Sequence, residues 1–163
     1  MMSDKIAPTA SGPQLVASGF DVRPADASDR GAAARLLGRF LEERGVASTP
    51  DDVAKAVEIA LQPRAAAWLV MASRGGVAVG VCLANFVVDP ARGAVLRIES
   101  LYVAPQHRRH GAGSALLEHV VREARAVGVA RVEIDVFPER ELPAALIERV
   151  GMRAVTGRRY VTS

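Results

Sequence analysis

Hydrophobic residues recur along this chain in two patterns. Strict alternation with polar residues predicts β-strands, and spacing by three or four residues predicts amphipathic α-helices. Residues 20–23 alternate strictly, as a short strand does. A helix is expected next, with Asp26 or Ser28 as its N-cap and Gly45 as its end. Its apolar face comprises Ala33, Leu36, Leu37, Phe40 and Leu41. Residues 1–18, which contain Ser, Pro, Gly and Ala, show little periodicity and are expected to form a mobile tail.

A second helix is predicted to begin after Thr49, because Thr49 suits an N-cap and Pro50 suits the first helical position. Pro63 ends it, and its buried stripe consists of Val53, Val57, Ala60 and Leu61. Three β-strands follow, at residues 66–72, 77–88 and 94–103. Residues 73–76 read Ser-Arg-Gly-Gly, which is typical of a hairpin turn between the first two of these strands.

A third amphipathic helix is predicted after a Gly-x-Gly run, and Gly128 ends it. Its apolar face comprises Leu116, Leu117, Val120, Val121, Ala124 and Val127. His119 lies outside that face and is expected to be exposed to solvent. A strand, a helix and a final strand complete the series, at residues 129–136, 141–150 and 152–162. The order β-α-α-β-β-β-α-β-α-β predicts an α/β (α+β) fold in which helices flank a mixed central sheet.

Length and composition narrow the choice of partners. The chain has 163 residues, of which 50% are hydrophobic, so residues 19–163 suit a single domain with a sizeable core. A net charge of +3 is the small difference between 21 basic and 18 acidic residues, and the basic side chains are scattered. Only 4% of residues are aromatic. No nucleic-acid partner is therefore expected.

The sequence also disfavours several kinds of site and location. Cys82 is the single cysteine and lies in an apolar run, so a buried, inert thiol is expected. No His, Asp and Glu cluster has the spacing of metal ligands, and no metal is expected. No apolar run approaches the roughly 18 residues of a membrane span, and the N-terminus lacks a signal-peptide pattern. These features predict no membrane contact and a cytoplasmic location.

The chemistry of the chain is concentrated in residues 108–114, which we term the phosphate loop. It reads Arg-Arg-His-Gly-Ala-Gly-Ser and opens the third helix. An anionic ligand is expected here, because amides at a helix N-terminus are unpaired and glycines let the backbone approach a ligand. A Walker loop is excluded because the loop contains no lysine. A dinucleotide fingerprint is excluded because Leu116 stands where its third glycine or alanine would be.

The phosphate loop fits the pattern Arg/Gln-x-x-Gly-x-Gly/Ala and is preceded by Leu-Tyr-Val-x-Pro. This stretch resembles the acetyl-CoA signature of the GNAT acetyltransferase superfamily. The resemblance implies that acetyl-CoA lies where the strands at residues 94–103 and 129–136 part from each other. The pantetheine and the pyrophosphate would then be held by Leu101, Tyr102, Val103, Arg108, Arg109, His110, Gly111, Ala112, Gly113 and Ser114.

Three side chains around the loop have two interpretations each. The Arg108 side chain either contacts the ligand or forms a salt bridge at the start of the helix. In the second case, the backbone of the neighbouring residues binds the ligand. His107 and His110 either bind the CoA phosphates or act as acid or base, or else they only add polarity to a surface loop.

The resemblance also implies direct acetyl transfer, which needs a neutral amine, an oxyanion donor and a proton source for the thiolate. Glu99 is the candidate base, because it precedes the expected acetyl position; alternatively, it faces solvent and pairs with Arg97 or another arginine. Many relatives carry a proton-donating tyrosine where this chain has Ile147. Tyr102 or Tyr160 would substitute for it, or the thiolate leaves without a protein acid.

Two functions therefore stay open at this stage. The first is an acetyl-CoA-dependent N-acetyltransferase acting on a primary amine of a small molecule or peptide. The second is a non-catalytic acyl-CoA-binding module that has lost the usual general acid. The resemblance places the acceptor between the first two helices, roughly at residues 42–54, and the C-terminal strand. Exposed sheet edges are compatible with a homodimer.

Overall fold

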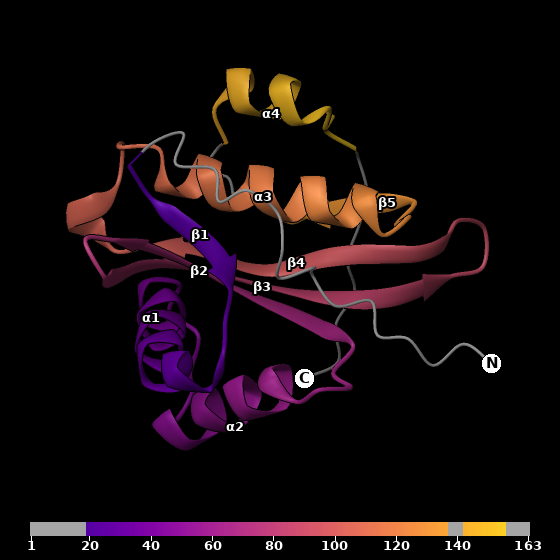
Figure 1. Ribbon diagram of the computed structural model, residues 1–163. Coiled ribbons are helices and arrows are strands. Elements are labelled where there is room, and N and C mark those ends of the chain that lie inside the picture. The colour runs from indigo at the N-terminus through magenta and orange to yellow at the C-terminus, as the bar shows by residue number, and fades with distance from the viewer. Residues whose placement is uncertain (1–18, 137–141, 156–163) are drawn as a thin grey trace.

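The computed structural model describes residues 19–136 and 142–155. Its strands are β1 (Asp21–Pro24), β2 (Ala67–Arg74), β3 (Val77–Asp89), β4 (Gly93–Val103) and β5 (Arg131–Ile134). Its helices are α1 (Arg30–Glu43), α2 (Pro50–Leu61), α3 (Ala112–Ala126) and α4 (Ala144–Val150), with short 3-10 helices η1 (Ala27–Asp29) and η2 (Pro105–His107). The strands form one five-stranded sheet, and α1 and α2 cover one face while α3 and α4 cover the other (Figure 1). The predicted α/β fold is confirmed.

Both of the first two helical segments begin with a capping box. At the first, the Asp26 carboxylate accepts a hydrogen bond from the Ser28 amide (2.7 Å), and the Asp29 carboxylate accepts one from the Asp26 amide (2.8 Å). Asp26 therefore serves as the N-cap, although it caps a 3-10 turn that precedes α1. At the second, the Thr49 hydroxyl accepts from the Asp52 amide (3.1 Å), as the sequence predicted.

The sheet changes direction of pairing at its last strand. Strands β1 to β4 pair antiparallel in sequence order, whereas β4 and β5 pair in parallel, from Val95 opposite Arg131 to Ile98 opposite Ile134. β5 ends there, while β4 continues to Val103. Within the described residues, the last part of β4 therefore has no strand beside it on the β5 side.

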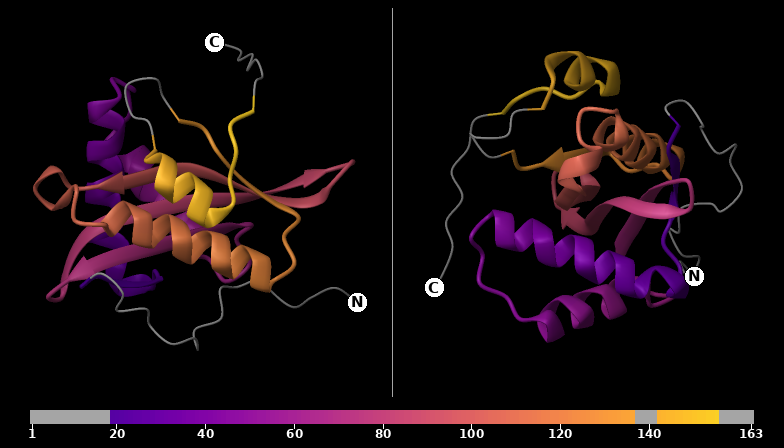
Figure 2. Two further views of the ribbon diagram at one scale, coloured as in Figure 1. Left: turned by 90° about the horizontal axis from the view of Figure 1, so that it is seen from above. Right: turned by 90° about the vertical axis from the view of Figure 1, so that its left-hand side faces the viewer.

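A β-bulge in β4 decides which way its later side chains point. The partners of Leu83 and Ala84 in β3 are Ser100 and Ile98, so Glu99 is an extra residue in β4. In a regular strand Ile98 and Tyr102 would share a face. With the bulge, Ile98 packs in the core beside α3, whereas Tyr102 packs in the core beside α1 and α2. Figure 2 shows these two layers on opposite sides of the sheet.

Some helices and strands end at other residues than predicted, because backbone amides near their ends bond to a neighbouring element. The Val129 amide donates to the Ala124 carbonyl (2.9 Å), which keeps Val129 at the end of α3 and shortens the predicted strand 129–136 to β5. Residues 152–155, the described start of the last predicted strand, have no regular structure. The rest of that strand and the predicted tail at 1–18 lie outside the described residues. No helix in the described ranges has the length and apolarity to cross a membrane.

Candidate functional site

The phosphate loop joins η2 to α3 and presents backbone amides that have no acceptor. Within the described ranges, main-chain bonding at the start of α3 begins with the Ala115 amide, which donates to the Gly111 carbonyl (2.9 Å). No described acceptor pairs with the amides of residues 109–114, and Gly111, the N-cap residue, has no side chain to cap them. These amides carry the positive end of the helix dipole. The loop is therefore built to receive an anion.

The backbone of the loop is held in an unusual conformation. Arg109 has a φ of 62° and is the one non-glycine residue with positive φ in the described part of the chain. Gly111 follows with a φ of 93°. Left-handed residues in a turn can direct successive N–H groups toward an anion, as in anion-binding nests. A non-glycine residue pays about 1–2 kcal/mol for this conformation, and such strain concentrates at functional sites.

The Arg108 side chain forms a salt bridge. Its guanidinium donates to both carboxylate oxygens of Glu43, at 2.9 and 2.8 Å, and its Nε donates to the Val103 carbonyl at 2.8 Å. It also lies 5.3 Å above the ring of Tyr102. Of the two interpretations of Arg108, the structure shows the salt bridge. Glu43, 65 positions away in the sequence, is the partner that sequence reasoning missed, and no local pattern signals such a pair.

Tyr102 belongs to the same network. Its side chain is buried, with 1% of its surface exposed, and its hydroxyl donates to Glu43 at 2.8 Å. Burial raises the pKa of Tyr102, and the hydrogen bond to Glu43 raises it further. A phenol that holds its proton more tightly is a weaker acid. This arrangement weighs against Tyr102 as the proton donor to a thiolate, and Tyr160 lies outside the described residues.

Glu99 lies exposed at the β-bulge, next to the part of β4 that β5 does not cover. Arg97 pairs with Glu133 at 3.2 Å instead of with Glu99. Among the described residues, Glu99 makes no ion pair, so its carboxylate is accessible to a ligand. The neighbouring edge of β4 carries Leu101 and Val103, and an unpaired strand edge can hold an extended ligand through backbone hydrogen bonds.

The histidines divide into two groups. His110 is exposed and His107 is half-buried in the segment that leads to α3. The expectation that His119 faces solvent was wrong, because His119 is half-buried on α3. Its Nδ1 lies 3.0 Å from the Arg122 guanidinium, and its Nε2 is buried without a hydrogen-bond partner in the described ranges. Burial, helped by Arg122, lowers the pKa of His119.

Other groups in the described chain offer little reactive chemistry. Cys82 is fully buried, and burial raises the pKa of its thiol to about 12, which keeps the thiol protonated. Residues 19–136 and 142–155 contain no group of three His, Cys, Asp or Glu side chains that could hold a metal ion.

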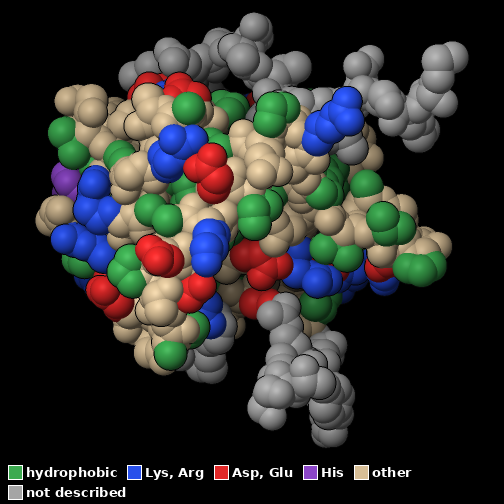
Figure 3. All heavy atoms as spheres, turned by 90° about the horizontal axis from the view of Figure 1, so that it is seen from below, with side chains coloured by type: hydrophobic (Ala, Val, Ile, Leu, Met, Phe, Trp, Pro, Cys, Tyr) green, Lys and Arg blue, Asp and Glu red, His purple; other side chains and the backbone are tan. Residues whose placement is uncertain are grey.

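On the face formed by α1 and α2, acidic and basic side chains are intermixed (Figure 3).

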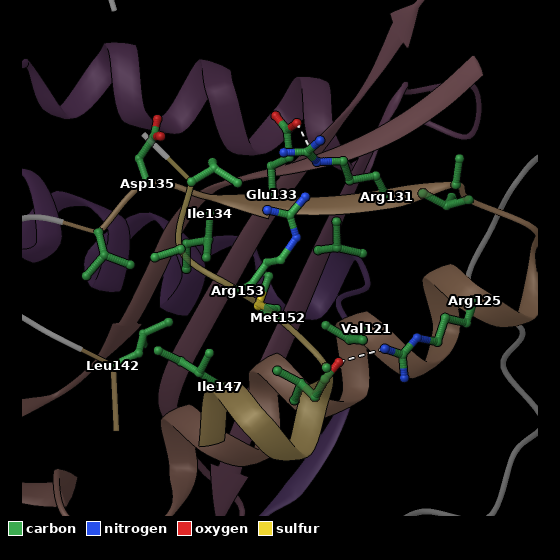
Figure 4. A pocket seen from close by; sticks show the side chains of 18 of the residues that line it. Val121, Arg125, Arg131, Glu133, Ile134, Asp135, Leu142, Ile147, Met152 and Arg153 are labelled. Carbon is green, nitrogen blue, oxygen red and sulfur yellow. Dashed lines mark hydrogen bonds and ion pairs between the residues drawn. The ribbon is translucent and has the colours of Figure 1, made fainter. Parts of the chain in front are cut away.

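A pocket of about 860 Å³ lies beside β5, away from the phosphate loop. Ile134, Leu142, Ile147 and Met152 contribute apolar side chains to it (Figure 4). Ile147, at the position where the resemblance would place a tyrosine, therefore lines a pocket next to β5 to which Arg131, Glu133 and Arg153 also contribute. None of residues 109–114 lines this pocket, so the pocket and the phosphate loop are separate features of the described chain.

Comparison with solved structures gives the same architecture. A possible acetyltransferase from Clostridium difficile 630 superposes with a TM-score of 0.74 at 19% identity, over 88% of this chain and 97% of that one. AAC(6')-Iy in complex with the bisubstrate analogue CoA-S-monomethyl-acetylneamine superposes with a TM-score of 0.74 at 20% identity, over 88% and 97%. Ribosomal-protein-alanine N-acetyltransferase from Brucella melitensis biovar Abortus 2308 gives 0.70 at 21% identity, over 88% and 98%.

At these identities the superpositions establish the fold. No curated protein matches the sequence. The family profile described as Acetyltransferase (GNAT) family, however, matches residues 30–152, which include strands β2 to β5, the β-bulge and the phosphate loop. The protein therefore belongs to the GNAT acetyltransferase family.

Proposed function

We propose that this protein is an acetyl-CoA-dependent N-acetyltransferase that transfers the acetyl group directly to a primary amine of a small molecule or peptide. The observation that carries the proposal is the pairing of two features of the described residues: amides of residues 109–114 without acceptors, and a β4 edge that no described strand covers near them. The first suits a pyrophosphate and the second suits an extended pantetheine arm. Family membership supports the same ligand.

The transfer forms a carbon–nitrogen bond to the amine and breaks the thioester carbon–sulfur bond. Glu99 is the proposed base that takes a proton from the ammonium, directly or through water. Backbone groups near Leu101 and Val103 are the proposed partners of the acetyl carbonyl. Because the Tyr102 hydroxyl is committed to Glu43, we assign no protein acid to the thiolate. A thiol with a pKa near 8.5 is a tolerable leaving group around neutral pH.

The names of the similar structures agree with an amine acceptor. One is an aminoglycoside N-acetyltransferase and another is a ribosomal-protein-alanine N-acetyltransferase. They represent a small-molecule amine and a protein amine, so the acceptor panel should contain both kinds.

The test has two stages. Thermal unfolding is measured with and without acetyl-CoA, and a ligand at a hundredfold its Kd should add about 2.7 kcal/mol to the free energy of unfolding. Free thiol released from acetyl-CoA is then followed with a panel of aminoglycosides, polyamines, amino acids and peptides. An unchanged melting temperature with every acyl-CoA would refute the proposal at its first stage.

A second function, a non-catalytic acyl-CoA-binding module, is favoured by one observation. Ile147 cannot donate a proton, and Tyr102 is hydrogen-bonded to Glu43, so no described tyrosine is available as the acid. This module would show the same rise in melting temperature with acetyl-CoA but would release no thiol with any amine. The two stages of the experiment therefore separate the two functions.

A further inference from the structure

We infer that Glu43 is a positioning residue for the phosphate loop: it fixes Arg108, and thereby sets the affinity for acetyl-CoA without touching the ligand. The inference rests on the proposed function, because it takes the phosphate loop as the CoA site. It assigns Arg108 a role inside the protein, in place of a direct contact with the CoA phosphates.

The geometry around Glu43 immobilises the guanidinium from three sides. Two hydrogen bonds join Arg108 to Glu43, and a third joins its Nε to the Val103 carbonyl. The Tyr102 ring lies beneath the guanidinium, and the Tyr102 hydroxyl orients the same carboxylate. The side chains of Arg108 and Glu43 are 33% and 28% exposed, whereas those of the Arg30–Glu58 surface pair are 52% and 55% exposed. Solvent therefore screens the Glu43–Arg108 pair less.

This anchor matters because the loop has little else to define its shape. The amides of residues 109–114 have no acceptor in the described chain, so few backbone hydrogen bonds hold the loop beyond those from the Arg108 amide to the Pro105 carbonyl and from the Ala115 amide to the Gly111 carbonyl. Arg108, the first residue of the loop, is followed directly by Arg109, whose positive φ must be maintained against its intrinsic cost. α3 fixes the far end of the loop, and Arg108 fixes the near end. Preorganising a binding loop raises affinity by lowering the entropy lost on binding.

The Arg108 guanidinium also connects α1 with the end of β4. Glu43 is the last residue of α1, and Val103 is the last residue of β4. Arg108 bonds to both. A change at Glu43 would therefore alter the loop through Arg108, although Glu43 belongs to a helix on the opposite face of the sheet from α3.

The experiment measures the acetyl-CoA Kd by titration calorimetry for wild type, Glu43→Gln, Arg108→Gln and the double variant. Glu58→Gln is the matched control, because it breaks a Glu–Arg pair on the same helical layer but far from the loop. We expect Glu43→Gln to weaken binding about tenfold, the loss that follows from about 1.4 kcal/mol. The double variant should bind no more weakly than Arg108→Gln alone, because both changes remove one interaction. Glu58→Gln should stay within about twofold of wild type.

A kinetic measurement separates positioning from general destabilisation. In the positioning role, Glu43→Gln raises KM for acetyl-CoA about tenfold and leaves kcat within about threefold. Circular dichroism melts establish that each variant is folded under the assay conditions. If Glu43→Gln does not fold, the salt dependence of the Kd decides instead: wild type and Arg108→Gln should weaken in parallel as salt rises, since neither uses Arg108 against the phosphate.

Three results would overturn the inference. Unchanged or tighter acetyl-CoA binding by Glu43→Gln would mean that Arg108, once released, does not need its anchor or reaches the ligand itself. A shallower salt dependence for Arg108→Gln would likewise reveal a direct phosphate contact. Absence of acetyl-CoA binding by wild type would refute the proposed function, and the inference with it; the first two results would leave the proposed function intact.

Discussion

The hydroxyl of Tyr102 donates a 2.8 Å hydrogen bond to the carboxylate of Glu43. This bond joins the buried side of β4 to the last residue of α1. It exists because the bulge at Glu99 turns Tyr102 toward α1 rather than toward α3. The hydroxyl is thereby part of the framework around the phosphate loop, and the predictions for Tyr102 follow from this position.

Replacing Tyr102 with phenylalanine should have a moderate structural effect and a small catalytic one. The ring keeps its edge-on contact with Phe40, and only the hydrogen bond is lost. We expect the free energy of unfolding to fall by about 1 kcal/mol, measured by urea denaturation. The kcat for thiol release should change less than threefold or so, whereas loss of a general acid would lower it by about 10²–10⁴. A fall of that size would make Tyr102 the proton donor.

The same residue should make stability sensitive to alkaline pH. Burial and the bond to Glu43 raise the pKa of Tyr102 in the folded state, so the folded protein holds a proton that the unfolded chain releases above its pKa of about 10. The stabilisation is complete below that pH and is lost as pH rises through the folded pKa. Urea denaturation from about pH 8 to about pH 11 should show the stability advantage of wild type over Tyr102→Phe shrinking with pH. A constant difference would contradict the raised pKa.

Gly80 should not tolerate a methyl group. A Cβ at this position would lie 3.0 Å from Leu116 Cδ1 and 3.1 Å from the Tyr102 carbonyl oxygen, and that backbone oxygen has little freedom to move. Gly80→Ala should cost about 1–3 kcal/mol of unfolding free energy. Gly38→Ala, in α1, is the matched control, because no atom lies within 4 Å of its Cβ position and alanine favours a helix by up to about 1 kcal/mol. Thermal melts should therefore shift in opposite directions.

Gly111→Ala should damage both stability and ligand binding. Its φ of 93° lies in a region that side chains disfavour, at a cost of about 1–2 kcal/mol, and relief of this strain would shift the loop amides. Gly128→Ala carries a similar backbone cost at φ 78°, at the far end of α3. Both variants should have a lower melting temperature than wild type, but only Gly111→Ala should weaken acetyl-CoA binding in calorimetry. Equal acetyl-CoA affinities for the two variants would show that the phosphate loop does not bind acetyl-CoA.

Glu99→Gln should separate chemistry from binding. The amide cannot take a proton from the ammonium, so kcat should fall by about 10²-fold or more at neutral pH, while the acetyl-CoA Kd stays close to wild type. The fall should lessen as pH rises and more of the amine is already neutral. Glu118→Gln, which loses only the surface ion pair with Arg149 on α4, is the control. Full activity of Glu99→Gln would assign Glu99 to a solvent-facing role.

Local patterns were sufficient for much of this protein. The helical spacing of Leu36, Leu37 and Phe40, the cap at Thr49 and the Gly-x-Gly run of the phosphate loop depend on neighbours within a few positions. Helix caps and amphipathic faces follow from such short-range chemistry. They predicted the order of elements from β1 to α4 and the helices that flank the sheet, and the family resemblance followed from the loop.

Contacts between distant segments settled the rest. The left-handed backbone of Arg109, the half-buried His119 and the bond from Glu43 to Arg108 have no signature in the residues around them. The network that joins Tyr102, Glu43 and Arg108 depends on one extra residue at Glu99, which reverses the faces of β4 and turns Tyr102 toward α1. Side chains alternate across a strand with a period of two, so a single inserted residue redirects every later one. The sequence by itself determined the helices, the strands and the family, because these depend on short-range patterns, and only the tertiary structure decided that Glu43 pairs with Arg108.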